Sequence, residues 1–144
     1  NDSIKNLIKK EREYGLDKIS TYQNFSEKIQ NVKKKLNDFV ESVNKEGKSI
    51  VCYGAPAKGN TLLNFCEIDK QQIDFVVDRS PYKQGLFLPG SHIPIKSVEA
   101  IQEAKPDYII ILPWNIKDEI MEQISFVTNW GGKFVIPIPE VKIL

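Results

Sequence analysis

Residues 49–61 read SIVCYGAPAKGNT, an apolar run followed by a turn of small residues. The β-branched and aromatic run predicts a buried strand over residues 49–53. The turn leads into residues 58–66, whose composition favours a helix. A strand, a glycine-containing turn and a helix in this order are typical of the first unit of an α/β domain with a parallel sheet. Ligands of such domains bind beyond the carboxyl ends of the strands, so we expect a site at this turn.

The same alternation continues toward the C-terminus. We expect further strands at residues 73–77, 108–112 and 133–136, with a weaker one near 92–95, and helices at residues 97–104 and 116–129. The unbroken apolar run at residues 108–112 predicts a strand that is buried on both faces of a sheet. The fold class is therefore α/β, a Rossmann-like doubly wound and mostly parallel sheet.

The first 47 residues differ from the rest, because they contain no proline and are rich in Lys, Glu and Asn. They predict a short helix from Asp2 or Ser3 to Gly15 and a longer one that begins at Asn24, with a capping box formed with Glu27. Apolar residues recur along the longer helix at spacings of three and four. We expect a helical segment at residues 1–47 that packs on a Rossmann-like domain at residues 48–144.

Composition narrows the function. The 144 residues are 41% hydrophobic and 27% charged, and their net charge is only +1, which argues against nucleic acid or an anionic membrane as the partner. No apolar run reaches the length of a membrane span. Cys52 and Cys66 lie in apolar stretches without metal-ligand spacing, so we expect buried thiols, no metal site and a cytoplasmic location.

The turn after the first strand has candidate binding residues at Gly54, Ala55, Lys58, Gly59 and Asn60. The glycines and the alanine are small enough to let backbone N–H groups approach an anion at the start of the next helix, where the lysine adds a positive charge. The spacing of the glycines is that of a P-loop, but asparagine stands where the lysine of that motif belongs. A proline also replaces the middle glycine of the dinucleotide motif. A purely structural turn is the alternative.

Polar residues also follow the second predicted strand. Asp78 lies 24 residues after Gly54, near the position at which a Rossmann domain accepts a ribose hydroxyl. Arg79, Lys83 and His92 follow on a long loop and are candidate partners for phosphate or carbonyl groups. A lone histidine is more often structural than catalytic, so the last assignment is the weakest of the three.

The third long strand leads into Trp114 and Asn115, an aromatic ring and an amide that could contact a base or a sugar. Packing is an equally good explanation for the tryptophan. We find no nucleophile with a base, no metal-ligand cluster and no pair of neighbouring carboxylates, so the sequence predicts a site for a phosphate-bearing small molecule and no catalytic residue.

Several longer motifs occur in a fixed order: YGAPAKGNTLLN at residues 53–64, VDRSP with KQG at 77–85, LPG with HIP at 88–94, LPWN with EIM at 112–121, and GGKF with PIP at 131–139. In this order they resemble the C-terminal domain of S-adenosylmethionine (SAM)-dependent sugar C-methyltransferases. The resemblance covers nearly all of residues 11–144.

The resemblance implies a longer enzyme in which a zinc-binding domain and a SAM-binding domain precede this one. That enzyme methylates a carbon of a keto-deoxysugar carried on a nucleoside diphosphate, through an enolate that attacks the SAM methyl group. It implies that this chain recognises the nucleotide-sugar and contacts the SAM-binding domain of the same polypeptide. Zinc, SAM and the catalytic base would belong to the other domains, so we expect this chain to be inactive alone and to bind no cofactor.

On this hypothesis the turn of residues 54–60 contacts phosphate or sugar oxygens, Asp78 accepts a hydroxyl, Arg79 and Lys83 offset diphosphate charge, and Trp114 with Asn115 lines the cleft. Two alternatives stay open. One is a domain that binds NAD(P), which the proline in the turn disfavours. The other is an interaction module that uses the helix at residues 24–46, with Phe25, Ile29 and Leu36 as its docking surface.

Overall fold

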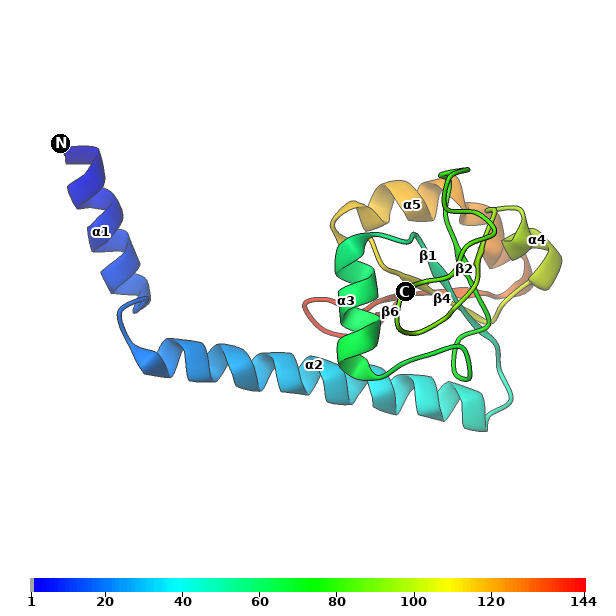
Figure 1. Cartoon of the computed structure of the whole chain (residues 1–144), viewed down its shortest axis with the longest axis horizontal. Coiled ribbons are helices and arrows are strands. Elements are labelled where there is room, and N and C mark those ends of the chain that lie inside the picture. Colours follow the sequence, from blue (N-terminus) through cyan, green and yellow to red (C-terminus); the bar gives the residue numbers. More distant parts are fainter. Residues whose placement is uncertain (1) are drawn as a thin grey trace. The chain divides into compact units, whose positions relative to one another are not determined.

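The computed structural model describes residues 2–144. The chain divides into two compact units, with the boundary between Asn31 and Val32. The first unit holds helix α1 (Asp2–Tyr14), a turn at Gly15 and the start of helix α2 (Ile19–Lys45) (Figure 1). The predicted first helix is confirmed. The predicted start of the second helix at Asn24 is wrong, because the chain re-enters the helix at Ile19. The Thr21 hydroxyl, which donates to the Gly15 carbonyl oxygen at 2.7 Å, ties the turn to that earlier start.

The second unit begins with the part of α2 from Val32 to Lys45. Leu36, Val40 and Val43 are buried there against the sheet, and the Asn37 side chain donates to the Cys66 carbonyl oxygen at 3.0 Å. Leu36 is fully buried, so it is not available for the docking surface of the interaction-module alternative, whereas Phe25 is 61% exposed. The predicted domain boundary after residue 47 stays a prediction.

The described residues form a six-stranded sheet in the order β3-β2-β1-β4-β5-β6. The strands are β1 (Ile50–Tyr53), β2 (Val76–Val77), β3 (Ile95–Lys96), β4 (Tyr108–Ile111), β5 (Lys133–Ile136) and β6 (Lys142–Ile143). Every neighbouring pair is parallel except β5 with β6. The predicted α/β, Rossmann-like and mostly parallel fold is therefore confirmed.

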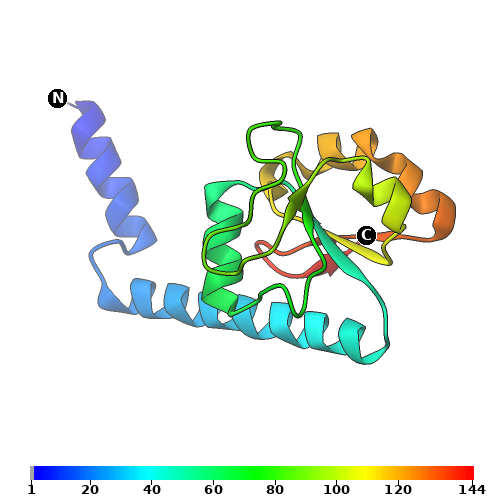
Figure 2. The same cartoon turned by 45° about the vertical axis from the view of Figure 1, so that its right-hand side comes forward.

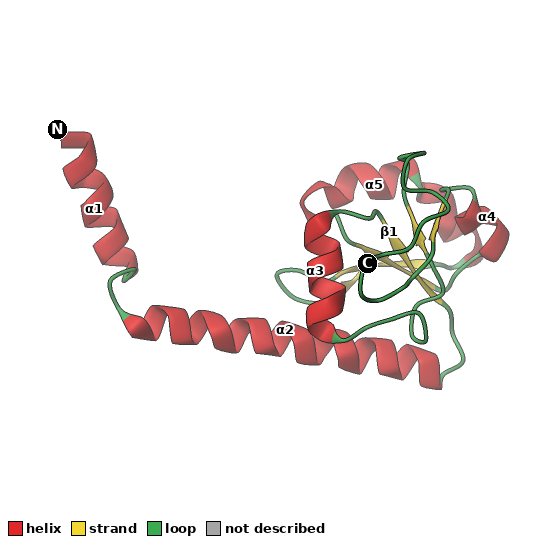
Figure 3. Cartoon of the chain, in the orientation of Figure 1, coloured by secondary structure: helices red, strands yellow, loops and turns green. Residues whose placement is uncertain are grey.

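The helices cover both faces of this sheet, as Figures 2 and 3 show. Helix α3 (Ala57–Cys66) and the buried part of α2 pack on one face, against Ile50 and Cys52 of β1. Helices α4 (Ala100–Ala104) and α5 (Lys117–Gln123), with the 3₁₀ turn η2 (Ser125–Trp130), pack on the other face, against Val51. Alternate residues of β1 thus point to opposite faces and are buried on both.

Four details depart from the sequence-based expectations. The weak strand expected at residues 92–95 is found at Ile95–Lys96, because His92 takes a left-handed conformation with φ of 56° in the turn before it. The strand expected at residues 73–77 is shortened to Val76–Val77. The helix expected at residues 116–129 breaks at Ile124, between α5 and η2. Strand β6 was not expected at all.

No helix within residues 2–144 is long and apolar enough to cross a membrane.

Candidate functional site

The candidate site lies where the order of the strands reverses. From β1 the chain moves through α3 to β2 and β3 on one side of the sheet, and it returns to the other side of β1 with β4. The connections that leave the carboxyl ends of β1 and β4 therefore diverge, and this point in a doubly wound sheet is where ligands bind. The structure has two adjoining cavities at this edge.

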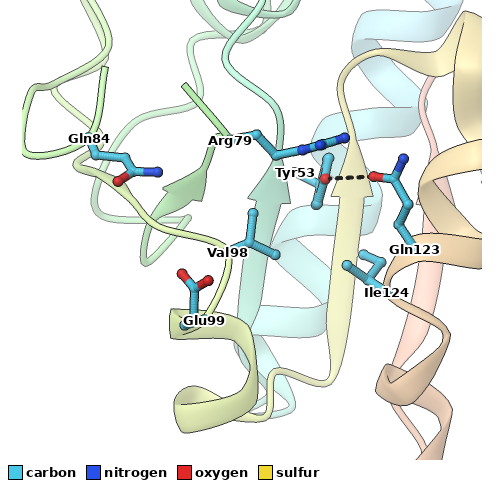
Figure 4. A pocket seen from close by; sticks show the side chains of 7 residues that line it. All are labelled: Tyr53, Arg79, Gln84, Val98, Glu99, Gln123 and Ile124. Atoms are coloured by element: carbon cyan, nitrogen blue, oxygen red, sulfur yellow. Dashed lines mark hydrogen bonds between the residues drawn. The ribbon is translucent and has the colours of Figure 1, made fainter. Parts of the chain in front are cut away.

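The larger cavity has a volume of about 460 Å³, within the usual range for small-molecule sites (Figure 4). Its walls come from β1, from the loop after β2, from the segment before α4, and from the end of α5: Tyr53, Arg79, Gln84, Val98, Glu99, Gln123 and Ile124. The smaller cavity, of about 150 Å³, shares Tyr53, Arg79 and Gln123 with it. The smaller one extends to Gly54 and to the residues around α5, among them Pro113, Ile116 and Glu119.

A chain of hydrogen bonds runs along the wall that the two cavities share. The Tyr53 hydroxyl donates to Oε1 of Gln123 at 3.3 Å, and Nε2 of Gln123 donates to Oε1 of Glu119 at 2.9 Å. Burial raises the pKa of Tyr53, and the charges of Asp78 and Glu119 add to this, while the positive charge of Arg79 opposes it. Tyr53 therefore remains a neutral hydrogen-bond donor and fixes which way the Gln123 amide points.

Arg79 places a positive charge in this cleft. It follows β2, lines both cavities, and its guanidinium extends toward Tyr53 and Gln123 in Figure 4. A guanidinium can donate two parallel hydrogen bonds to one phosphate group. Its place on the shared wall lets it contact a ligand that occupies either cavity.

The carboxylate of Asp78 is already bonded to other groups of the protein. Its carboxylate accepts hydrogen bonds from the backbone N–H of Ala55 at 2.7 Å and of Ser80 at 2.8 Å, and the Lys83 ammonium lies 3.3 Å from it. Lys83 also donates to the Ala55 carbonyl oxygen at 3.0 Å. Burial acts to raise the pKa of Asp78, but these donors outweigh it and hold the pKa below its usual value. Asp78 and Lys83 thus join the turn after β1 to the loop after β2.

The turn after β1 is closely packed. Gly54 has φ of +83°, and a Cβ atom there would lie 2.5 Å from Cγ of Pro113. A Cβ atom on Gly59 would lie 2.7 Å from Cβ of Leu112. Both glycines therefore let the α3 turn approach the segment that follows β4. Pro56 supplies no side-chain cap to α3, so the amide groups of its first turn have no acceptor from a capping side chain.

Three of the sequence-predicted residues come together beside this turn. The Lys58 ammonium lies over the Trp114 ring, 4.3 Å from its centroid, and donates a hydrogen bond to Oδ1 of Asn115. Lys58 belongs to α3, and the other two belong to the 3₁₀ turn η1 (Trp114–Ile116) after β4. In this arrangement the lysine itself covers a face of the tryptophan ring.

His92 and Asn60 are placed elsewhere. His92 is exposed, and its backbone N–H donates to the Leu88 carbonyl oxygen at 3.0 Å. It is not one of the described residues that line the two cavities. Asn60 lies on α3, where its backbone carbonyl oxygen accepts a hydrogen bond from Nδ2 of Asn64 at 2.8 Å. It too is absent from the described residues that line the two cavities. Their assignment to the site stays a prediction that these contacts do not support.

Four polar residues of the larger cavity were not predicted: Tyr53, Gln84, Glu99 and Gln123. Gln123 stands four residues after Glu119, so helical spacing alone would place the two side chains on one face. Tyr53 is the last residue of β1, next to the turn. Gln84 lies in the KQG motif, which assigns it no role, and Glu99 lies outside the motifs of the resemblance.

The cysteines and the turn after β1 are the places where zinc or a cofactor would be sought in this chain. Residues 2–144 contain no group of three or more His, Cys, Asp or Glu side chains that could hold a metal ion. Burial raises the pKa of both cysteine thiols, that of Cys66 to about 11, which disfavours the thiolate form that zinc requires. In the turn after β1, where a Rossmann domain holds its cofactor, Gly54 packs against Pro113, and the Ala55 amide donates to the Asp78 carboxylate.

The fold and the cleft define a Rossmann-like domain with a polar site at its switch point. Residues 1–139 match the family described as the C-methyltransferase C-terminal domain, and the chain belongs to this family. It is 36% identical over 142 residues to the C-methyltransferase NovU of Streptomyces niveus. That match covers 99% of this chain and 34% of the relative, so the chain spans about a third of the relative's length.

Among solved structures, the chain is similar to UDP-D-quinovosamine 4-dehydrogenase from Vibrio fischeri. The TM-score is 0.46 and the sequence identity 15%, and the match covers 67% of this chain and 93% of that one. A similarity at this level says nothing about which ligand the present chain binds.

Proposed function

We propose that this chain recognises the nucleotide-sugar substrate of a SAM-dependent C-methyltransferase, a keto-deoxysugar carried on a nucleoside diphosphate. The observation that carries this proposal is the position of Arg79 on the wall shared by two cavities at the switch point. A diphosphate lies in the middle of a nucleotide-sugar, with a nucleoside on one side and a sugar on the other. A cation flanked by two compartments fits that order of groups.

Further groups support binding of the diphosphate. Lys58 stands in the first turn of α3, beside the positively polarised end of that helix, where an anion is stabilised. Its ammonium is held by Asn115 and Trp114, so it is already directed toward the end of β4. Lys83 and Asp78 fix the loop that carries Arg79, so the guanidinium is presented from an ordered backbone.

The role of this chain is to bind and orient the sugar. SAM supplies the methyl group in such an enzyme. We therefore propose that the SAM-binding domain of the same polypeptide is the partner of this chain and carries SAM and the catalytic base. The free and buried thiols of Cys52 and Cys66 support a reducing, cytoplasmic location.

The test is calorimetric titration of the chain with dTDP-glucose, dTDP, UDP and NAD at modest salt. We expect saturable binding of the nucleotide-sugar, weaker binding of the free nucleotides, and no binding of NAD. Binding of NAD in preference to the nucleotide-sugar would instead support the dinucleotide-binding alternative. Absence of binding for every nucleotide would contradict the proposal for this chain.

A further inference from the structure

The first unit of the chain has an apolar face that the described residues of the unit leave uncovered. Helix α1 has no buried residue between Asp2 and Tyr14, although its apolar residues recur at spacings of three and four. The large apolar side chains at the start of α2 are exposed as well. Six residues, each between 41% and 76% exposed, define this face, which we name the uncovered stripe: Ile4, Leu7, Ile8, Tyr14, Tyr22 and Phe25.

The second half of α2 carries the same pattern and is covered. The spacing of three and four continues along the helix after Phe25. Its members in the second unit, Leu36, Val40 and Val43, are buried in the core of that unit. One helix therefore buries the second half of its apolar face and exposes the first half. A 13-residue helix without tertiary packing is only marginally stable in water, so the matching pattern of α1 indicates that another surface covers it.

A hollow of about 420 Å³ lies in the uncovered stripe, at the turn between α1 and α2. Tyr14, Tyr22 and Phe25 are among the residues that line it. The Tyr22 hydroxyl donates to the Leu16 carbonyl oxygen at 2.7 Å, so this ring is held against the turn. Aromatic side chains around a preformed hollow are typical anchors of a protein–protein interface.

One carboxylate lies within the uncovered stripe. Glu11 stands four residues after Leu7 and three before Tyr14, so helical geometry places it among the apolar side chains. On the polar face of the same helix Glu13 pairs with Lys9 at 3.8 Å, whereas Glu11 has no ion pair within residues 2–144. A buried carboxylate without a partner is costly, so a surface that covers the stripe has to present a positive charge to Glu11.

This charge distinguishes the surfaces that could cover the stripe. A second copy related by a two-fold axis would bring the stripe against itself, and its six residues and Glu11 include no lysine or arginine. A lipid bilayer would have to take the carboxylate into its apolar layer, which is also costly. A further domain of the same polypeptide can supply both an apolar surface and a cation.

The comparisons provide room for such a domain. The family is described as a C-terminal domain, and its match includes the residues of α1 and of the start of α2. The match to NovU covers 34% of that protein, so about two thirds of it lie outside the match. The uncovered stripe thus belongs to a domain that, in this relative, is accompanied by a much longer stretch of chain.

We propose that the uncovered stripe is the docking surface for the SAM-binding domain of the same polypeptide, which places an apolar side chain in the hollow and a lysine or arginine beside Glu11. This inference rests on the proposed function, which makes that domain the partner of the chain. It assigns the chain two separate surfaces. The cleft of the second unit binds the nucleotide-sugar, and the stripe of the first unit binds the partner domain.

Hydrogen–deuterium exchange of this chain and of the full-length polypeptide tests the docking. In the chain alone, the amides of α1 should exchange rapidly, because a helix without tertiary packing opens locally. In the full-length polypeptide, we expect the amides of α1 to exchange more slowly by roughly tenfold or more. The amides of β4, in the core of the second unit, should exchange equally in both proteins. Equal exchange of α1 in the two proteins would overturn the proposal.

Two variants of the full-length polypeptide test the residues of the stripe. Leu7→Asp and Glu11→Lys should each return α1 to the rapid exchange of the chain alone. Asn6→Asp and Glu13→Lys are the matched controls, because they make the same changes of charge on the polar face of the same helix, and they should leave the slow exchange unchanged. Controls that accelerate exchange as much as the stripe variants would show that the stripe is not the contact.

The other occupants are tested on the chain alone. Sedimentation velocity should show a monomer, and vesicles of phosphatidylcholine and phosphatidylglycerol should not bind the chain. A dimer that Leu7→Asp dissociates would assign the stripe to a second copy, and vesicle binding that Leu7→Asp abolishes would assign it to a membrane. Either result would overturn the proposal.

Calorimetry with dTDP-glucose keeps the proposed function separate from the docking. Leu7→Asp should leave the affinity of this chain for dTDP-glucose unchanged, because the described residues that line the two cavities all follow Lys48. If the unmodified chain does not bind dTDP-glucose, the proposed function fails, whereas the exchange of α1 in the full-length polypeptide decides the docking by itself.

Discussion

The turn after β1 and the cleft beside it lie at the same edge of the sheet but are built in opposite ways. In the turn, Gly54 and Gly59 pack against the segment after β4, and the Ala55 amide is bonded to Asp78. In the cleft, Arg79 and Gln123 face open volume. A glycine-containing turn can thus owe its composition to packing, while the open cavity lies beside it and is lined in part by residues outside every motif, such as Gln123.

The largest effect is expected from the packing of the turn. Gly54→Ala places a methyl group against Pro113 in a left-handed backbone conformation, and it should lower the free energy of unfolding by about 3 kcal/mol. Gly85→Ala is the matched control, because Gly85 also has φ of +83° but open space around it, and it should cost about 1 kcal/mol. Urea denaturation measures both. Equal losses would show that conformation, and not packing against Pro113, requires the glycine.

The second effect concerns binding in the cleft. Arg79→Ala should weaken binding of dTDP-glucose by roughly 30-fold, since a charge-assisted hydrogen bond to phosphate contributes about 2 kcal/mol. Arg12→Ala, an exposed arginine of α1, should leave the affinity unchanged. Calorimetry compares the two variants. Equal affinities for both would place the phosphate contact outside the cleft.

The third effect concerns the link between the turn and the cleft. Asp78→Asn weakens the acceptor for the Ala55 and Ser80 amides and removes the charge near Lys83, so it should cost about 1–2 kcal/mol of stability. Lys83→Met removes only one of these donors and should cost less. Urea denaturation at pH 7 compares them, and a larger loss for Lys83→Met would contradict the assigned roles.

The same carboxylate predicts a pH dependence. The folded state holds the pKa of Asp78 below its usual value near 4, so its stabilising contribution is fully present above that value and is lost as the pH falls through the lower, folded-state pKa. The stability difference between the unmodified chain and Asp78→Asn should therefore shrink below about pH 4. Denaturation curves from pH 7 to pH 3 measure it, and a difference that grows on acidification would contradict the sign.

The smallest effect is expected at Lys58, which carries the positive charge beside the turn after β1. Lys58→Ala should weaken dTDP-glucose binding by about threefold or less, because the exposed ammonium is already held by Trp114 and Asn115. Lys70→Ala, an exposed lysine outside the site, serves as its control. A loss larger than that of Arg79→Ala would reverse the comparison and make the turn the main phosphate site.

Much of the fold could be predicted because burial on both faces leaves unbroken apolar strands, as in Tyr108–Ile111. The features that were missed depend on longer-range structure. Strand β6 is a two-residue antiparallel pairing with β5, too short to show a period. The break at Ile124 occurs within an apolar spacing that continues through Val127, so the pattern gives no sign of it.

The edge that carries the site was also predictable, because parallel strands bring their carboxyl ends together. This placed Lys58, Trp114 and Asn115 near one another, although none of the three is among the described residues that line either cavity, and it put Arg79 at the cleft. That Gln84 and Gln123 line one cavity was not predictable, because only the folded chain brings the loop after β2 and the end of α5 to the same cavity.

Chemical-shift mapping tests the location of the site most directly. In a ¹⁵N-labelled sample titrated with dTDP-glucose, the largest backbone amide shifts are expected at Arg79, Gln84 and Gln123, with smaller ones at Asn115. Shifts confined to the turn of residues 54–60, or to the helices before Val32, would contradict the assignment of nucleotide-sugar binding to the cleft.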